Sequence, residues 1–246
     1  MDIESMKLIR RVIFIVLLTS SVFAYSNTIV VGVTKSAPPF SSVDTNNHYF
    51  GFCIDIMNNL CKRINATCKY KPIPLENQLN ALNTGDIDIT FSPSPIIETD
   101  AGNYVFSIPY MTSNGEFVTL NPEIKTIADI KNKRIGILQE SNLEHILLHY
   151  TTKENIKEYP TSSGLISAIL NDKVDALLLN VMLIKYLSYN KIISFHIIGK
   201  RISLGNGYGI IALKKNAKLM NQINKALLQM ENDGTYEAIY KKYFGS

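Results

Sequence analysis

Several classes of protein are excluded by what this sequence has little of. Charged residues make up only 19% of the 246 residues, 46% are hydrophobic, and the mean hydropathy is +0.05. Such a balance excludes a disordered chain, a collagen-like chain and a membrane protein with several spans. The length suffices for one large domain or two small ones, each with its own core.

The sequence also lacks a large excess of either charge and lacks common catalytic motifs. The formal net charge is +4, from 25 basic and 21 acidic residues, and no basic stripe alternates with aromatic residues, so nucleic acid is not expected as a partner. The sequence has no G-x-S-x-G elbow, no H-E-x-x-H pair and no G-x-G-x-x-G that opens a helix. His145 and His149 stand four apart on a predicted helix, but surface or packing roles are favoured over metal binding. We therefore expect no cofactor, no metal and no catalytic residue.

Three cysteines are too few for a disulfide scaffold but enough for one bridge. Cys61 stands near the end of an apolar helical pattern over 53–64, and Cys68 opens the alternating stretch C-K-Y-K-P-I. A bridge between them would tie the helix end to the next strand and stabilise the fold by roughly 2–3 kcal/mol. Cys53 is left over at an apolar helix start, where a buried thiol is favoured over a nucleophile.

The first 24 residues have the order of a secretory signal. Lys7, Arg10 and Arg11 precede the apolar run 12–18, and the segment ends V-F-A. The run is too short for a membrane anchor, and no cysteine follows it for a lipid anchor. We expect cleavage after Ala24 and export to an oxidising compartment; the alternative is a buried N-terminal helix.

The rest of the sequence predicts two α/β units. The first is a β-α-β-α-β series, the second is a longer alternation, and the chain ends in two helices. Strands are predicted over 28–33, 69–73, 87–91, 116–120, 134–138, 156–159, 174–179, 192–198 and 208–213. Helices are predicted over 53–64, 75–85, 126–131, 142–150, 163–170, 181–188 and about 219–230, with a final helix that Thr235 caps. Two α/β lobes that face each other would enclose a cleft at the carboxyl ends of their strands.

An ordered set of short motifs covers nearly the whole chain after the signal. They are P-P-F (38–40), G-F-x-I-D-I (51–56), C-K-R-I-x-x-x-C (61–68), G-D-I-D (85–88), F-S-x-P-Y (106–110), I-A-D-I-K-N-K-R-I-G (127–136), D-A-L-L-L (175–179) and D-G-T-Y-x-x-I-Y-x-K-Y-F (233–244). With this set the chain resembles the periplasmic amino-acid-binding proteins, the type-3 solute-binding family of ABC importers, such as the lysine/arginine/ornithine-, histidine- and glutamine-binding proteins.

The resemblance implies a two-lobed periplasmic binding protein with two hinge strands. Lobe 1 would comprise 27–115 plus 211–246, lobe 2 would comprise 118–207, and the hinges would lie near 116–118 and 208–210. The lobes would close on a small polar solute, and a membrane-bound ABC permease would read the closed form. The protein would be a periplasmic monomer, and it would not be an enzyme.

The sequence departs from this family at its charged anchors. The arginine that usually holds the ligand carboxylate falls on Asp100, and the acidic residue that holds the ammonium falls on Asn180. We therefore expect a polar solute other than an ordinary α-amino acid in the usual pose, either rich in amides or hydroxyls or carrying an amine that pairs with Asp100. The predicted ligand-binding residues are Thr34, Ala37, Leu75, Ser92, Pro93, Ser94, Asp100, Leu138, Asn142 and Asn180.

Other interpretations stay open. A local shift of the alignment would bring Lys35 or Arg134 in to supply charge, and Asp100 could be a solvated loop residue. The similar cyclohexadienyl dehydratases use this cleft as an active site for anionic substrates, which Asp100 opposes. A third interpretation is a solute sensor that acts through a membrane partner.

Overall fold

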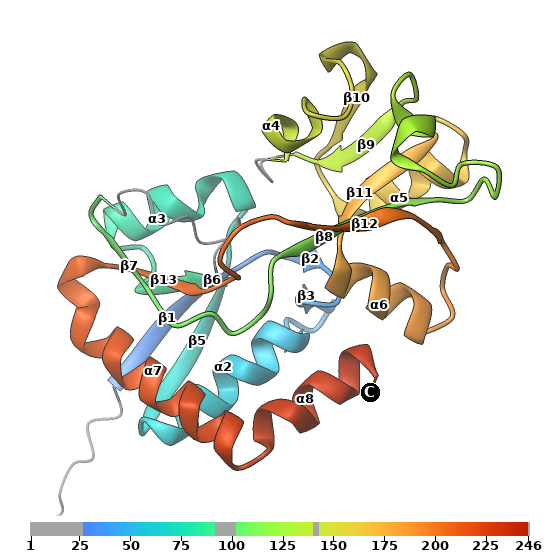
Figure 1. Cartoon of the computed structure of the whole chain (residues 1–246). Helices are drawn as coiled ribbons and strands as arrows, with labels where there is room; N and C mark the ends of the chain where they lie inside the picture. The colour runs from blue at the N-terminus through green and yellow to red at the C-terminus, as the bar shows by residue number, and fades with distance from the viewer. Residues whose placement is uncertain (1–26, 92–101, 140–142, 246) are drawn as a thin grey trace, which may run out of the picture.

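The computed structural model describes residues 27–91, 102–139 and 143–245, so the predicted signal lies outside the described residues. It has two α/β lobes, each built on its own five-stranded sheet (Figure 1). None of the helices within these ranges is long and apolar enough to cross a lipid bilayer.

Lobe 1 is formed by the two ends of the described chain. Its elements are β1 (Asn27–Val33), β2 (Ser36–Ala37), β3 (Ser41–Val43), β4 (Tyr49–Phe50), α2 (Phe52–Arg63), β5 (Ala66–Pro72), η1 (Leu75–Asn77), α3 (Gln78–Thr84), β6 (Ile89–Phe91), β7 (Tyr104–Phe106), β13 (Ile210–Leu213), η4 (Lys214–Asn216), α7 (Ala217–Asn232) and α8 (Thr235–Phe244). The strand order of its main sheet is β5-β1-β6-β13-β7, and β2, β3 and β4 form a small separate sheet.

Lobe 2 is formed by the middle of the chain. Its elements are β8 (Asn114–Thr119), η2 (Ile127–Ile130), β9 (Ile135–Leu138), α4 (Glu144–Leu147), η3 (Lys153–Asn155), β10 (Ile156–Tyr159), α5 (Ser162–Leu170), β11 (Ala176–Asn180), α6 (Val181–Tyr189) and β12 (His196–Ser203). Its strand order is β10-β9-β11-β8-β12.

The two sheets share one plan. In lobe 1, β1 pairs in parallel with β5 and β6, and β13 then pairs antiparallel with β6 and β7. In lobe 2, β9 pairs in parallel with β10 and β11, and β8 then pairs antiparallel with β11 and β12. The antiparallel strand of each sheet, β13 or β8, is thus the one that has just arrived from the other lobe.

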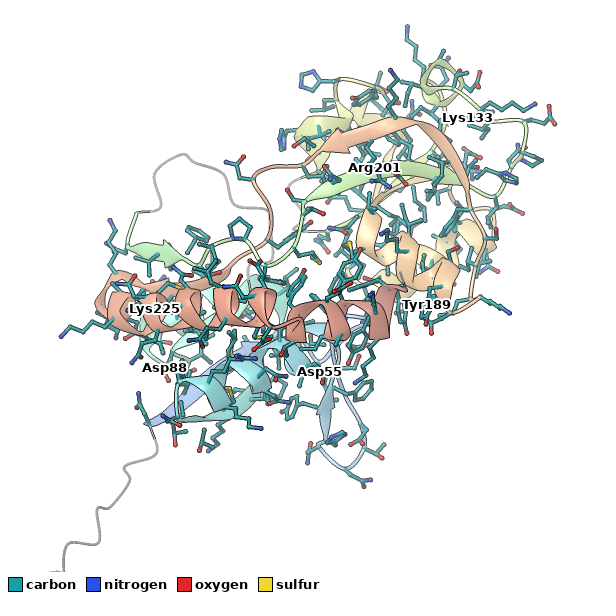
Figure 2. The ribbon with its side chains drawn as sticks, turned by 60° about the horizontal axis from the view of Figure 1, so that its bottom comes forward. Asp55, Asp88, Lys133, Tyr189, Arg201 and Lys225 are labelled. Carbon is teal, nitrogen blue, oxygen red and sulfur yellow. A yellow bond between two sulfur atoms is a disulfide. The ribbon has the colours of Figure 1, made fainter. Side chains whose placement is uncertain are left out.

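Alternation along the strands gives each sheet two apolar faces, because successive side chains point to opposite sides. In β13, Ile210 and Ala212 face the cluster under α2 and α7, whereas Ile211 faces the cluster under α3. In β8, Phe117 and Val118 likewise belong to different clusters. Both sheets are therefore covered on both faces, as a mostly parallel sheet requires, while Lys225 and Lys133 lie on the outer surfaces of lobes 1 and 2 (Figure 2).

The predicted disulfide is confirmed. Cys61 and Cys68 are bonded, with their Cα atoms 6.0 Å apart, and join the last turn of α2 to β5. Asn65 between them has φ 54°, a left-handed conformation that ends the helix. Cys53 is free and buried, as predicted.

Two segments connect the lobes, residues 107–113 and 204–209, and they run beside each other. An isolated bridge joins Met111 to Tyr208, and the Ser113 hydroxyl donates to the Gly205 carbonyl oxygen at 2.6 Å. Gly207 has φ +104°, and a Cβ there would lie 2.7 Å from the Pro109 Cβ.

Residues 116–118, where the sequence predicts a hinge, lie inside β8 and pair with β11 and β12. The lobe boundaries given above remain a prediction.

Some element boundaries differ from the prediction. The final helix begins at Thr235, but its N-cap is Gly234, and the Asp233 carboxylate accepts the Thr235 N–H at 3.0 Å. The helix predicted over 142–150 is observed only as α4, and Asn142 lies outside the described residues. The strand predicted to start at Ile192 starts at His196, because the Ile192 N–H closes a turn onto the Leu187 carbonyl oxygen.

Candidate functional site

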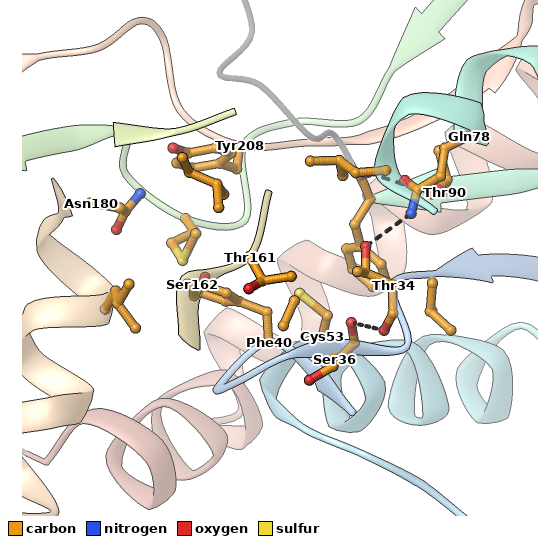
Figure 3. A pocket seen from close by; sticks show the side chains of 18 of the residues that line it. Thr34, Ser36, Phe40, Cys53, Gln78, Thr90, Thr161, Ser162, Asn180 and Tyr208 are labelled. Atoms are coloured by element: carbon orange, nitrogen blue, oxygen red, sulfur yellow. Dashed lines mark hydrogen bonds between the residues drawn. The ribbon is translucent and has the colours of Figure 1, made fainter. Parts of the chain in front are cut away.

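A cavity of about 200 Å³ lies between the lobes (Figure 3). Its walls come from lobe 1, from lobe 2 and from the two connecting segments. The lining residues are Gly32, Val33, Thr34, Ser36, Ala37, Phe40, Ser41, Cys53, Leu75, Gln78, Thr90, Phe91, Tyr110, Met111, Leu138, Leu143, Pro160, Thr161, Ser162, Leu165, Leu178, Leu179, Asn180, Leu183, Leu204 and Tyr208.

The lobe 1 wall contains a buried polar cluster at the ends of β1 and β6. The Gln78 amide nitrogen donates to Thr34 Oγ1 at 3.2 Å and to the Ile73 carbonyl oxygen at 3.3 Å. The Gln78 amide oxygen lies 2.8 Å from Thr90 Oγ1, which donates to it. Gln78 is only 2% exposed and Thr90 is fully buried. Because their hydrogen-bonding groups are engaged within the protein, these two side chains position Thr34 more than they serve a solute.

The turn between β1 and β3 forms the rest of that wall. The Ser41 hydroxyl donates to the Thr34 carbonyl oxygen at 2.8 Å, and the Phe40 N–H donates to the Ala37 carbonyl oxygen at 2.8 Å. These bonds hold the turn so that Ala37, Phe40 and Ser36 line the cavity. Ser36 is exposed, so its hydroxyl is available to a solute.

The lobe 2 wall is built at the carboxyl ends of parallel strands, where ligands bind in open α/β sheets. Leu138 ends β9, Thr161 follows β10, and Asn180 ends β11. Thr161 and Asn180 also cap helices: Thr161 Oγ1 accepts the Gly164 N–H at 3.1 Å, and Asn180 Oδ1 accepts the Met182 N–H at 2.7 Å. Strand end and helix start therefore place each of these polar side chains at the cavity.

The floor of the cavity carries two ionisable groups that burial keeps neutral. The Cys53 Sγ lies 3.6 Å from the Tyr110 hydroxyl oxygen, and both side chains are buried. Burial raises the pKa of the Cys53 thiol to about 12, and burial together with the adjacent Cys53 raises the pKa of Tyr110 as well. At neutral pH neither a thiolate nor a phenolate is present there.

Tyr208 comes from the second connecting segment and lies close to the lobe 2 wall. Burial raises the pKa of its hydroxyl, and a hydrogen bond with the Asn180 side chain opposes part of that increase. Tyr208 thus brings a hydroxyl from a connecting segment to the cavity, on the same side as Asn180 of lobe 2.

The described lining carries no acidic, basic or imidazole side chain. Neither residue of the alternative alignment changes this. Lys35 is absent from the lining, and Arg134 forms a two-pronged ion pair with Asp175, at 2.7 and 3.0 Å. Arg134 directly precedes β9, whereas Leu138 at the far end of that strand faces the cavity.

Half of the predicted site residues can be located. The described residues Thr34, Ala37, Leu75, Leu138 and Asn180 all line the same cavity. The others, Ser92, Pro93, Ser94, Asp100 and Asn142, lie outside the described residues. A ligand-binding role for any of them stays a prediction.

Several lining residues are not among the residues predicted from the sequence. Thr161 follows the strand predicted over 156–159, so the rule that ligands bind beyond the carboxyl ends of strands would have found it. Tyr208 was assigned to a hinge and Cys53 to the core, and each also borders the cavity. Gln78 gave no signal, since an isolated glutamine in a short helix is ordinarily solvated.

Comparisons with known proteins agree with this architecture. The family described as bacterial extracellular solute-binding proteins, family 3, matches residues 29–246. The arginine-binding periplasmic protein of Mannheimia haemolytica is 28% identical over 220 residues, which cover 88% of this chain and 91% of the relative. The histidine-binding periplasmic protein of Salmonella typhimurium is 28% identical over 239 residues, covering 92% and 91%.

Comparison with solved structures also finds periplasmic binding proteins. A periplasmic binding protein of an arginine transport system from Legionella pneumophila superposes with a TM-score of 0.78 at 31% identity, covering 89% of this chain and 100% of that one. An ancestral arginine-binding protein bound to arginine gives a TM-score of 0.75 at 30% identity, covering 89% and 99%.

Proposed function

Because the chain belongs to the bacterial extracellular solute-binding proteins of family 3, we propose that it captures a small amino-acid-like solute between its lobes and delivers it to an ABC permease. One observation carries the proposal. A single cavity is lined by both lobes and by both connecting segments, so a bound solute would contact every part that must move when the lobes close.

The size of the cavity fits a small metabolite. Its volume of about 200 Å³ exceeds the about 150 Å³ that suffices for benzene in an engineered protein cavity. Closure would remove water from such a site and strengthen its polar contacts. The family consists of solute-binding proteins, and the neutral Cys53 and Tyr110 offer no activated nucleophile or base, so the proposal includes no chemical step.

Ligand binding is tested first by thermal unfolding with each common amino acid and its amide, followed by calorimetry on the hits. A ligand at one hundred times its dissociation constant stabilises the native state by about 2.7 kcal/mol. Ala37→Phe should abolish binding by filling the cavity, and Ala128→Phe, an exposed position on η2, serves as the matched control. No stabilisation by any member of the panel would contradict the proposal.

Export and delivery need separate tests. We propose that the mature protein starts at Tyr25 in the periplasm, which amino-terminal sequencing of the periplasmic fraction checks. Cells that lack the chain should lose uptake of the identified ligand. If these cells take up the ligand normally but no longer change their transcription when the ligand is added, the sensor interpretation would be favoured instead.

A further inference from the structure

The walls of the cavity between the lobes define which solute side chain fits, and this inference rests on the proposed function. The lobe 2 wall is made largely of leucines, among them Leu138, Leu165 and Leu183, and Leu75 and Phe40 contribute from lobe 1. A solute group placed among these side chains gains from burial only if it is itself apolar.

The polar side chains on the described walls are uncharged, and several of them already form hydrogen bonds within the protein. Gln78 and Thr90 bond to each other and to backbone carbonyl oxygens. Asn180 uses its side-chain oxygen to cap α6. The hydroxyls of Ser36 and Ser162 are available to a solute, and the Thr34 hydroxyl, which accepts from Gln78, can still donate. Hydroxyls bond well to neutral polar groups.

A cationic side chain meets no counter-charge on the part of the walls that the structure describes. Among the described lining residues there is no carboxylate, and a buried cation without a partner costs more than a hydrogen bond or an aromatic face returns. Phe40 and Tyr208 supply aromatic surface, but that surface serves an apolar group equally well.

We propose that the solute held in this cavity has an uncharged, mainly apolar side chain, and that cationic side chains of the same shape are selected against. Arginine, for which one of the relatives above is named, is then not the preferred ligand of this chain.

Calorimetry with two matched pairs tests the proposal: norleucine against lysine, and citrulline against arginine. Each pair keeps a similar shape and changes the side-chain charge. We expect the neutral member to bind at least tenfold more tightly in both pairs. Equal or tighter binding of the cationic members would overturn the inference and leave the proposed function intact. If no amino acid binds at all, the proposed function fails and the inference fails with it.

Two variants test whether the charge of the cavity wall sets the preference for neutral side chains. Thr34→Asp keeps an oxygen that accepts from Gln78 and adds a negative charge at the wall, so it should shift the norleucine-to-lysine affinity ratio at least tenfold towards lysine. Asn80→Asp, an exposed position on α3, is the matched control and should leave the ratio unchanged. If Thr34→Asp does not fold, Leu75→Glu places the charge elsewhere on the same wall. An unchanged ratio in a folded wall variant would overturn the inference, as would a preference for lysine in the natural chain that Asp100→Asn abolishes.

Discussion

The two lobes share one sheet plan but are packed with different chemistry. In lobe 1 the fully buried Phe52 has ring contacts with Tyr110, Tyr236, Tyr243 and Phe244. In the described part of lobe 2 one aromatic pair is found, Phe117 with Tyr150, and the two apolar clusters are otherwise mostly aliphatic. Lobe 1 also carries the disulfide.

This difference matters because the aromatic cluster of lobe 1 extends to the places where the lobes meet. Tyr110 lies on a connecting segment and at the cavity floor, and the Tyr236 hydroxyl donates to its carbonyl oxygen. Beyond the connecting segments, Lys185 on α6 donates to the Tyr240 hydroxyl on α8 at 2.9 Å. We expect lobe 1, with the disulfide and the larger aromatic cluster, to be the more stable body.

The largest expected effect is on stability, and it compares the hydrophobic cores of the two lobes directly. Phe52→Ala should lower the free energy of unfolding by about 4–5 kcal/mol, and Phe117→Ala by about 3 kcal/mol, because Phe52 loses more ring contacts for the same loss of volume. Urea unfolding followed by circular dichroism measures both. An equal or larger loss for Phe117→Ala would contradict the idea that the aromatic cluster makes lobe 1 the more stable body.

Loss of the disulfide should affect lobe 1 alone. Reduction, or Cys61→Ser with Cys68→Ser, should lower the stability of lobe 1 by about 2–3 kcal/mol because a short loop is released in the unfolded chain. Hydrogen exchange should show faster exchange of amides in α2 and β5, with β9 and β11 unchanged. Equal acceleration in both lobes would show that they unfold as one unit.

The contact between α6 and α8 should affect ligand affinity more than stability. Tyr240→Phe removes the hydroxyl that accepts from Lys185, and such a hydrogen bond is worth about 1 kcal/mol. Because the contact favours the lobe orientation that forms the cavity, the dissociation constant should rise about threefold to fivefold. Tyr104→Phe, whose hydroxyl bonds to Asn83 within lobe 1, is the matched control. Equal affinity of the natural chain and Tyr240→Phe would show that this contact does not hold the lobes.

The smallest effect concerns acid, and here the lobes should behave alike. Hydrogen bonds from Thr235 and Arg63 lower the pKa of Asp233 in lobe 1 to about 2, and hydrogen bonds from Arg134 lower the pKa of Asp175 in lobe 2. A lowered carboxyl pKa stabilises the fold above the unfolded value of about 3.9, and this stability is lost as the pH falls towards the folded value. Asp233→Asn should therefore flatten the decline of melting temperature between about pH 4 and pH 2, and Asp175→Asn should flatten the decline that begins below about pH 4. An unchanged decline in either variant would show that its ion pair does not contribute.

Sequence patterns predicted the parts of the fold that local chemistry decides. The apolar spacing in α2 and α7 and the pairing of Cys61 with Cys68 needed no long-range information. The strands β2, β3, β4 and β7 were missed, because two or three residues show no alternation and β7 finds its partner, β13, more than one hundred residues later.

The site residues also divide into those that the sequence reveals and those that only the folded chain reveals. The resemblance to the family pointed to Asn180, and both Asn180 and Leu138 stand at the ends of strands. Gln78 and Tyr208 were not predicted as site residues, because only the assembled lobes bring them to the cavity. The absence of charge from the described walls is a property of the packed structure, since Lys35 and Arg134 are near in sequence and do not line them.

Small-angle scattering with a ligand identified by calorimetry tests most directly that one cavity, shared by two closing lobes, holds the solute. The radius of gyration should fall when the ligand saturates the protein, and it should stay unchanged in Ala37→Phe, where binding is blocked. Ligand binding confirmed by calorimetry with no change in the scattering profile, or the same change in Ala37→Phe, would contradict the account.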